Sequence, residues 1–439
     1  MDGRPVSRVL DLTDPAGNRI LNMTLEEARG RVARGAPDQF RGIDGSFALC
    51  GRDGETVRLA RSIDRPLRYF LAKQAEGPLL VLSDRIDRIH EALVARGLEG
   101  QFHPSYTRMV PAHHVVTIRL VGCPDPDPEY ARFFAPARGV LPADTAEIGL
   151  RYVGVLASEI GRWLSALPPA EPIGVCFSGG VDSGAVFLLT YHLLRATGGS
   201  PARLKAFTLS AGRGADVAQA LAFLEGLGLG LFLEPIDADP ASLDPGEAVR
   251  VVEDYKALDV ESATMALALC RGIRERYPAW KHLADGDGGD ENLKDYPIEE
   301  NAELTIRSVL NNPMLYQEGW GVGTIKHSLT YSGGQSRSYT RTYAPLSLYG
   351  FSGFSPFTRP SVIEVAEGIP FVALTNWNHE RLYSLKGEIV SKGIEAVTGM
   401  KMPVFPKRRF QDGAPGGEAR TAWRRPESFY RAEFLSRYV

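Results

Sequence analysis

Short apolar runs alternate with amphipathic stretches through the C-terminal two thirds of the chain. An apolar run at 173–177 precedes apolar residues at helical spacing over 184–195. Further apolar runs at 204–209 and 229–236 flank a helical pattern over 216–225, which Gly226 and Gly228 are expected to end. This alternation predicts an α/β fold with a parallel, doubly wound sheet. Ligands are then expected at the carboxyl ends of its strands.

A further helix is predicted by its start signals. Asp244 supplies an N-cap, Pro245 a first-turn proline and Glu247 an acid at the third position. We expect this helix to carry Glu253.

The first 125 residues follow a different pattern, in which short apolar strands are separated by turns and a helix follows 80–84. Prolines crowd the stretch between Pro124 and Pro142, which marks a connection. The sequence therefore predicts a β-rich domain over 1–125, a linker over 126–145 and a parallel α/β domain over 146–439 with a helical C-terminal part.

A glycine-rich loop, Ser178-Gly179-Gly180-Val181-Asp182-Ser183, follows the run at 173–177. The paired glycines let the backbone approach an anion, and the helix that follows offers free N–H groups. Ser178 and Ser183 add hydroxyl donors, and Asp182 is a carboxylate of the kind that binds Mg²⁺. The lysine of G-x-x-x-x-G-K-[ST] loops is absent. The loop predicts ATP binding; the alternative is a glycine turn that binds nothing.

A second glycine-rich loop, at 285–291, carries four acids in seven residues. Carboxylates this close repel one another unless a cation or hydrogen bonds compensate them, which favours a Mg²⁺ site. The spacing differs from that of a Ca²⁺-binding EF-hand loop. The other interpretation is a solvated acidic loop.

The two loops resemble those of the PP-loop ATP pyrophosphatase superfamily, and together they resemble the synthetase domain of the asparagine synthetase family. The resemblance implies ATP and Mg²⁺ as cofactors and cleavage of ATP to AMP and pyrophosphate. It implies nucleotide contacts at Ser178, Gly179, Gly180, Asp182, Ser183, Leu209, Asp285 and Gly286, metal ligands at Asp182 and Asp290, and catalytic acids at Asp287 and Glu291. Asp285 replaces the family's usual serine, and Asp287 its usual glutamate.

The C-terminal third extends the resemblance. The stretch 355–370 is similar to the family's V-P-F-L-D, helix, I-N-P segment, and 385–390 resembles its K-x-x-L-R helix, which makes Lys386 a catalytic candidate. The stretch 406–413 resembles its Q-K-x-x-F-S-D-G segment and places Lys407 on the catalytic lysine. The alternative for Lys407 is an ordinary lysine in a basic tail. The polar stretch 327–343 has no counterpart in the family and is read either as part of a larger substrate pocket or as a polar loop.

The N-terminal region resembles the later half of the family's Ntn-type glutaminase domain, through its G-x-F-A and P-L-Y landmarks. The family's nucleophile is an N-terminal cysteine, whereas this chain begins Met1-Asp2-Gly3 and its first cysteine, Cys50, lies inside a predicted strand. We therefore expect a truncated domain without glutaminase activity.

Composition narrows the function classes. A net charge of −3 gives no general attraction to nucleic acid or acidic membranes, and the four cysteines are scattered, which argues against structural zinc or iron–sulfur sites. No membrane-length apolar run or signal-peptide pattern occurs, so a cytoplasmic enzyme is expected.

The sequence predicts an ATP-dependent carbon–nitrogen ligase of AMP-forming type. It would activate a small-molecule or peptide carboxylate as an acyl adenylate and transfer it to an amine or ammonia, forming an amide, lactam or macrolactam as the similar β-lactam synthetases and lasso-peptide cyclases do. Two alternatives stay open: an ammonia-dependent asparagine synthetase served by a separate glutaminase, and a non-catalytic nucleotide-binding scaffold. A carrier protein, an amine-supplying protein and a second copy of the chain are the partners considered.

Overall fold

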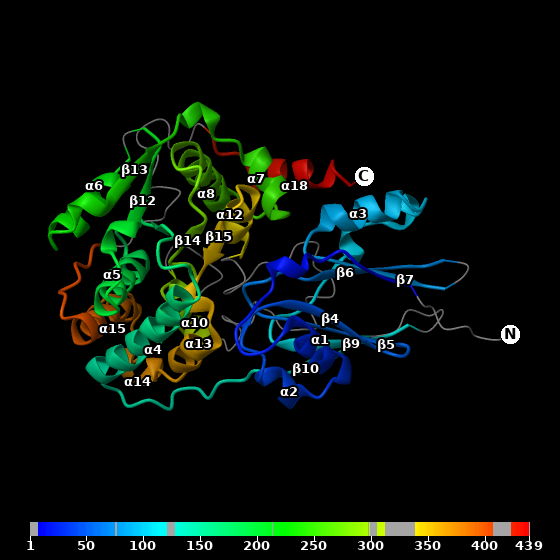
Figure 1. Cartoon of the computed structure of the whole chain (residues 1–439), viewed down its shortest axis with the longest axis horizontal. Coiled ribbons are helices and arrows are strands. Elements are labelled where there is room, and N and C mark those ends of the chain that lie inside the picture. The colour runs from blue at the N-terminus through cyan, green and yellow to red at the C-terminus, as the bar shows by residue number, and fades with distance from the viewer. Residues whose placement is uncertain are drawn as a thin grey trace. The chain divides into compact units, whose positions relative to one another are not determined.

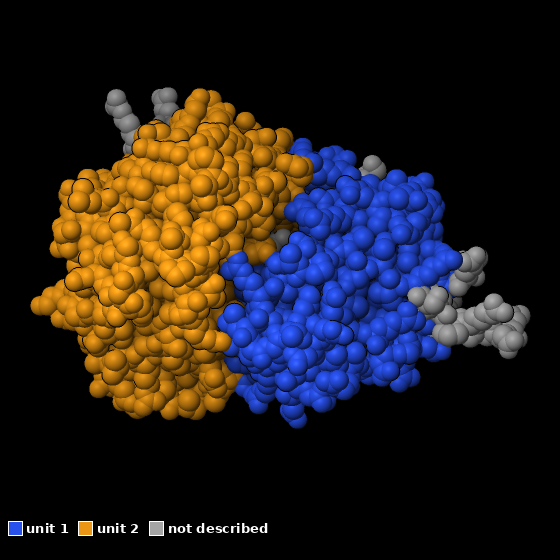
Figure 2. Space-filling model, in the orientation of Figure 1, with its two compact units in different colours: residues 1–135, 317–339, 432–439 blue, residues 136–316, 340–431 orange. Residues whose placement is uncertain are grey.

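The structure is a computed structural model that describes residues 8–74, 77–120, 128–212, 214–296, 298, 305–311, 339–406 and 423–438. The chain divides into two compact units, the first built mainly from Met1–Ala135 and the second from Pro136–Tyr316 and Thr340–Arg431 (Figure 2). The division falls within the predicted linker, 126–145, whose bounds stay a prediction. No helix in the described residues is long and apolar enough to cross a membrane.

The first unit contains two four-stranded sheets (Figure 1). One has the order β1 (Val9–Asp11), β7 (Leu79–Ser83), β6 (Arg68–Ala72), β8 (Arg108–Met109), and the other the order β10 (Glu129–Arg132), β9 (His114–Arg119), β5 (Thr56–Arg61), β4 (Ala48–Asp53). A short hairpin pairs β2 (Arg19–Ile20) with β3 (Gly45–Ser46), and the helices are α1 (Leu25–Arg34), α2 (Pro37–Arg41) and α3 (Ile86–Val94).

Both sheets of the first unit contribute to one buried cluster, in which Val57 and Leu59 of β5 meet Leu80 and Leu82 of β7. The other face of β4 and β5 packs on α1, where Val32 is fully buried. The β-rich character predicted from the short strands is confirmed. The resemblance of this unit to a glutaminase stays a prediction.

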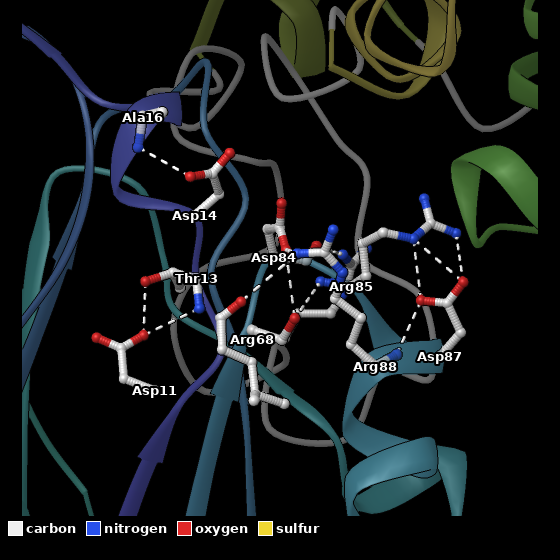
Figure 3. Close-up of polar contacts among 11 residues, drawn as sticks. Asp11, Thr13, Asp14, Ala16, Arg68, Asp84, Arg85, Asp87 and Arg88 are labelled. Atoms are coloured by element: carbon white, nitrogen blue, oxygen red, sulfur yellow. Dashed lines mark hydrogen bonds and ion pairs between the residues drawn. The ribbon is translucent and has the colours of Figure 1, made fainter.

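Polar contacts connect the end of β7 to the start of α3 (Figure 3). Arg68 donates a hydrogen bond to the backbone oxygen of Asp84 over 2.8 Å. Arg85, at the N-cap of α3, pairs with Asp87 over 2.8 Å. These contacts fix the turn that connects β7 to α3.

The second unit is built on a five-stranded parallel sheet, which confirms the predicted α/β fold (Figure 1). Its order is β13 (Leu233–Asp237), β12 (Leu204–Ser210), β11 (Ile173–Cys176), β14 (His282–Ala284), β15 (Ser352–Phe354). Parallel strands need crossovers, and here helices supply them. The described helices of this unit are α4 (Thr145–Ser165), α5 (Val181–Ala196), α6 (Asp216–Glu225), α7 (Pro245–Val252), α8 (Ala257–Arg276), α9 (Gly289–Leu293), α10 (Ile306–Asn311), α12 (Ala344–Leu348), α13 (Pro360–Glu367), α14 (Phe371–Thr375) and α15 (His379–Thr398). Helix α18 (Glu427–Leu435) begins in this unit and ends in residues assigned to the first.

Alternate residues of the strands face two separate hydrophobic clusters. Ala206 of β12 and Ala284 of β14 belong to the cluster formed with α4, α5 and α15. Phe207 and Leu283, their neighbours in sequence, belong to the cluster formed with α8 and α12. The sheet is therefore covered on both faces, as the doubly wound prediction requires.

Two boundaries differ from the sequence prediction. The strand expected over 229–236 begins only at Leu233, because residues 230–232 form a 3₁₀ turn after Gly228, whose φ is +69°. Helix α7 ends at Val252, so Glu253 does not lie within it. Glu253 is the C-cap, with a left-handed φ of 51°. The predicted N-cap is present, since the side chain of Asp244 accepts from the N–H of Gly246.

Candidate active site

The first glycine-rich loop, at 178–183, lies between β11 and α5, as predicted. We call it the phosphate-type loop. Its turn is closed by its own serines: the Ser178 N–H donates to Ser183 Oγ over 3.2 Å, and the Gly180 N–H donates to Ser178 Oγ over 3.3 Å. Gly179 has a φ of +71°, and a Cβ atom there would lie 2.9 Å from the Cα of Ala220 in α6. Glycine is required at this position, because any side chain would be strained and would collide with backbone.

The second glycine-rich loop, at 285–291, follows β14 and is called the acidic loop below. It lies directly against the phosphate-type loop. A Cβ atom on Gly286 would lie 2.8 Å from the backbone N of Ser183, and one on Gly289 would lie 2.2 Å from Oδ1 of Asp182. Glycine at 286 is therefore needed for the close approach of the two loops, whereas a side chain at 289 would displace the carboxylate of Asp182. Because β11 and β14 are adjacent parallel strands, their carboxyl ends bring the loops together.

Lys386 of α15 joins the acids of the two loops. Its Nζ donates to Oδ2 of Asp182 over 2.5 Å and also to Oδ1 of Asp290, and it lies 3.5 Å from Oδ2 of Asp295. Lys386 is only 4% exposed. Burial alone lowers the pKa of this ammonium, but the charges of Asp182, Asp290 and Asp295 outweigh burial and raise the pKa well above its ordinary value. The two carboxylates predicted to bind metal thus converge on one permanent cation.

Helix α15 holds Lys386 in place through a close contact with α4. A Cβ atom on Gly393 would lie 2.2 Å from the backbone oxygen of Gly149, and one on Gly149 would lie 2.5 Å from the backbone oxygen of Ile389. The two helices therefore approach backbone to backbone. This packing sets the depth at which Lys386 enters the site.

The donor set of Asp182 and Asp290 fits a Mg²⁺ ion only in part. Among the described residues, no group of three or more His, Cys, Asp or Glu side chains is arranged to hold a metal ion. Mg²⁺ bound to nucleotides commonly takes one or two carboxylates and completes its shell with phosphate oxygens and water. Asp182 and Asp290, which already share the ammonium of Lys386, suit a site that the protein and the nucleotide complete together.

Asp285 and Asp287 stand at the centre of the acidic loop. Asp285 is 3% exposed, accepts a hydrogen bond from Ser355 Oγ over 2.7 Å and accepts another from the Asp287 N–H over 3.0 Å. Burial and the nearby charge of Asp287 raise the pKa of Asp285 well above its ordinary value. Burial also raises the pKa of Asp287, while Thr342 and Arg341 act in the opposite direction.

Arg341 and Thr342 belong to a short π-helical turn, Tyr339–Tyr343. Thr342 Oγ1 donates to Oδ2 of Asp287, and Arg341 Nε pairs with Oδ1 of the fully buried Asp259 over 3.2 Å. Burial lowers the pKa of Arg341, but the charges of Asp259, Glu291, Asp287 and Asp290 outweigh this and raise it. Among the described residues, Arg341 is therefore a buried cation near the acidic loop, in addition to Lys386.

The other predicted site residues have mixed outcomes. Glu291 is buried, 6% exposed, and faces Arg341. Leu209, at the end of β12, is 1% exposed within the cluster on the α8 side of the sheet, and its predicted contact with adenine stays a prediction. Burial raises the pKa of Cys176 well above its ordinary value, which makes a nucleophilic role unsuitable. Lys407 lies outside the described residues.

Sequence reasoning missed several residues that the structure brings to the site. Asp295 contacts Lys386, Gln219 donates to the backbone oxygen of Ser178 over 3.3 Å, and Thr342 bonds Asp287. Asp295 had a local signal, because it follows Asp290 closely in an acid-rich stretch. Thr342 lay in the polar stretch 327–343 considered as a pocket, but its contact with Asp287 had no signal, and Gln219 had none at all, since tertiary folding alone brings both to the loops.

One comparison with known proteins gives a family match. Residues 167–344 match the family model of asparagine synthase. The matched segment contains β11, both glycine-rich loops and the π-helical turn. No curated protein matches the chain. Among solved structures, NMN synthetase from Francisella tularensis is similar at 15% identity and a TM-score of 0.23, over 60% of this chain and 99% of that one, which is too slight to bear on function.

Proposed function

We propose that the chain joins a carboxylate to an amine at the expense of ATP, on the premise that residues 167–344, which match the family model of asparagine synthase, act as an ATP-dependent ligase domain of that kind. In this proposal ATP is cleaved to AMP and pyrophosphate. The observation that carries it is the convergence of Asp182 and Asp290, from two adjacent strand ends, on the ammonium of Lys386.

In the first step an oxygen of the substrate carboxylate attacks the α phosphorus of ATP, and pyrophosphate leaves with the electron pair of the broken P–O bond. The backbone N–H groups around Gly179 and Gly180, with the hydroxyls of Ser178 and Ser183, bind phosphate oxygens. Asp182 and Asp290 would hold Mg²⁺, which supplies positive charge to the pyrophosphate oxygens. Lys386, held between these carboxylates, adds a fixed positive charge beside them.

In the second step an amine attacks the carbonyl carbon of the acyl adenylate and AMP leaves, which forms the amide. We propose that Asp287 accepts the amine proton; its hydrogen bonds with Thr342 and Asp285 support this role because they fix its position. Lys407 remains the proposed source of charge for the developing oxyanion, on the resemblance of 406–413 alone.

The nitrogen source is proposed to lie outside this chain's first unit. Cys50 of the first unit is part of β4, and burial raises the pKa of its thiol to about 12. A thiol held protonated in a strand is a poor nucleophile. We therefore propose a free or delivered amine, or an amine within the same substrate, in place of glutamine hydrolysis. An intramolecular amine would make the product a lactam or macrolactam.

Carboxylate-dependent exchange of labelled pyrophosphate into ATP tests the proposal. The parent chain is expected to catalyse exchange with at least one member of a panel of amino acids, β-amino acids and peptides. Asp290→Asn should lower the exchange rate by about a hundredfold, while Asp53→Asn, the same change at an exposed position of β4, should not. Equal rates for Asp290→Asn and the parent would overturn the site, and a parent that exchanges with no carboxylate would overturn the ligase function.

A further inference from the structure

The π-helical turn at Tyr339–Tyr343 belongs to the polar stretch 327–343, for which the sequence left open a substrate pocket or a polar loop. We propose that Thr342 and Arg341 are positioning residues that hold Asp287 as the acceptor of the amine proton, and that they act only in the amide-forming step. This inference rests on the proposed ligase function and extends it to residues with no assigned role.

The first observation is that Asp287 is held both at its carboxylate and at its backbone. Thr342 Oγ1 donates to its Oδ2, and its own backbone N–H is bonded to Asp285 over 3.0 Å. Asp285 is anchored in turn by Ser355 from the loop after β15. Among the described residues, the remaining oxygen of Asp287, Oδ1, accepts no hydrogen bond. The side chain is therefore oriented with one oxygen left for a substrate proton.

The second observation concerns charge. Arg341 is anchored by Asp259, whose carboxylate is fully buried at the start of α8, and its guanidinium faces Asp287. The other charged or titratable groups that face Asp287 are Asp285 and Asp290 of its own loop and the thiol of Cys176 in β11. Burial and the charge of Asp290 raise the pKa of Asp287, whereas the positive charge of Arg341 acts in the opposite direction and favours the ionised carboxylate. An ionised carboxylate is the form that can accept a proton.

The chemistry separates the two steps of the reaction. In amide formation the amine nitrogen bonds to the acyl carbon, the bond from that carbon to the AMP oxygen breaks, and AMP leaves with the electron pair. The nitrogen then carries a surplus proton, which passes to Oδ1 of Asp287. Thr342 keeps its own proton throughout. Adenylation releases no N–H proton, so it does not need this arrangement.

Thr342→Val removes the donor with little change of shape, and Thr342→Ser retains it. With a carboxylate that supports exchange in the parent, we expect Thr342→Val to exchange pyrophosphate within about twofold of the parent but to form amide roughly 10- to 100-fold more slowly. Thr342→Ser should restore amide formation. The acid limb of the pH profile for amide formation should move to higher pH in Thr342→Val, because the lost hydrogen bond favoured the ionised carboxylate.

The matched control is Thr197→Val, since the Thr197 hydroxyl bonds only backbone at the end of α5. It should leave both half-reactions unchanged. Amide formation by Thr342→Val at the parent rate, or an equal loss in both half-reactions, would overturn the inference while leaving the ligase function intact. A parent with no exchange for any carboxylate would instead overturn the proposed function, and this inference with it.

Discussion

Replacement of Lys386 by methionine is the sharpest perturbation of the site. The methionine keeps an unbranched apolar stem of similar length on α15 but removes the ammonium that Asp182, Asp290 and Asp295 share. These carboxylates have side chains that are 19%, 34% and 10% exposed, so water replaces the lost charge only in part.

The expected loss of stability is large because Lys386 is almost fully buried. Removing one partner of a buried ion pair typically costs about 3–5 kcal/mol, since the remaining charge is left uncompensated. The partial exposure of Asp290 puts the expected value for Lys386→Met near the lower end, at about 3 kcal/mol. The quantity to measure is the free energy of unfolding in urea at pH 7.

Lys392→Met is the matched control on the same helix. The side chain of Lys392 is 45% exposed and pairs with Glu388 one turn away. Exposed pairs of this kind contribute about 0–1 kcal/mol. The two variants carry the same change, so their difference isolates the buried cluster.

Two further responses distinguish this cluster from ordinary packing. The deficit of Lys386→Met should shrink as pH falls towards 4, because protonation of one carboxylate relieves the repulsion. Mg²⁺ should stabilise Lys386→Met more than the parent, because the carboxylates no longer share an ammonium. A loss of unfolding free energy below about 1 kcal/mol, or one that changes with neither pH nor Mg²⁺, would refute the reasoning.

Three more predictions concern the loop, the helix packing and pH. Gly179→Ala should weaken ATP binding at least about tenfold by calorimetry, since its Cβ would meet α6 backbone at 2.9 Å, whereas Gly198→Ala, with a similar φ and open space, should not. Gly393→Ala should cost about 1–3 kcal/mol in urea unfolding through overpacking against α4, while Gly154→Ala, in open space on α4, should be neutral or stabilising. Burial raises the pKa of Glu388, but hydrogen bonds from three neighbours lower it from 4.5 to about 2. Its stabilising contribution relative to Glu388→Gln should therefore be full above pH 4.5 and disappear as pH falls through about 2; a difference that grows in acid would contradict this assignment.

The strand, loop and helix at the first glycine-rich motif could be predicted because their signals are local. Apolar runs of strand length end at glycines, and the following residues return to helical spacing. The same local rules failed after Gly228, where two glycines within three residues favoured a 3₁₀ turn over the start of a strand. They failed again at Glu253, where the backbone takes a left-handed conformation that glutamate rarely adopts and that its residue type therefore does not predict.

The contacts between the motifs could not be predicted from local pattern. Lys386 meets Asp182 across 204 residues of sequence, and Thr342 meets Asp287 across 55. Such pairs depend on which strand ends are adjacent and on how closely α15 approaches α4. Resemblance to a family identified Lys386 as a site residue, but the three carboxylates that it joins emerge only from the fold.

Transfer of ¹⁸O from the substrate carboxylate tests the central claim most directly. A carboxylate that supports pyrophosphate exchange is labelled with ¹⁸O and converted to amide with its amine, and the products are examined by mass spectrometry. Attack of the carboxylate on the α phosphorus predicts one ¹⁸O atom in AMP. Label in inorganic phosphate, or AMP without label, would contradict activation through an acyl adenylate at the loops that contain Asp182 and Asp290.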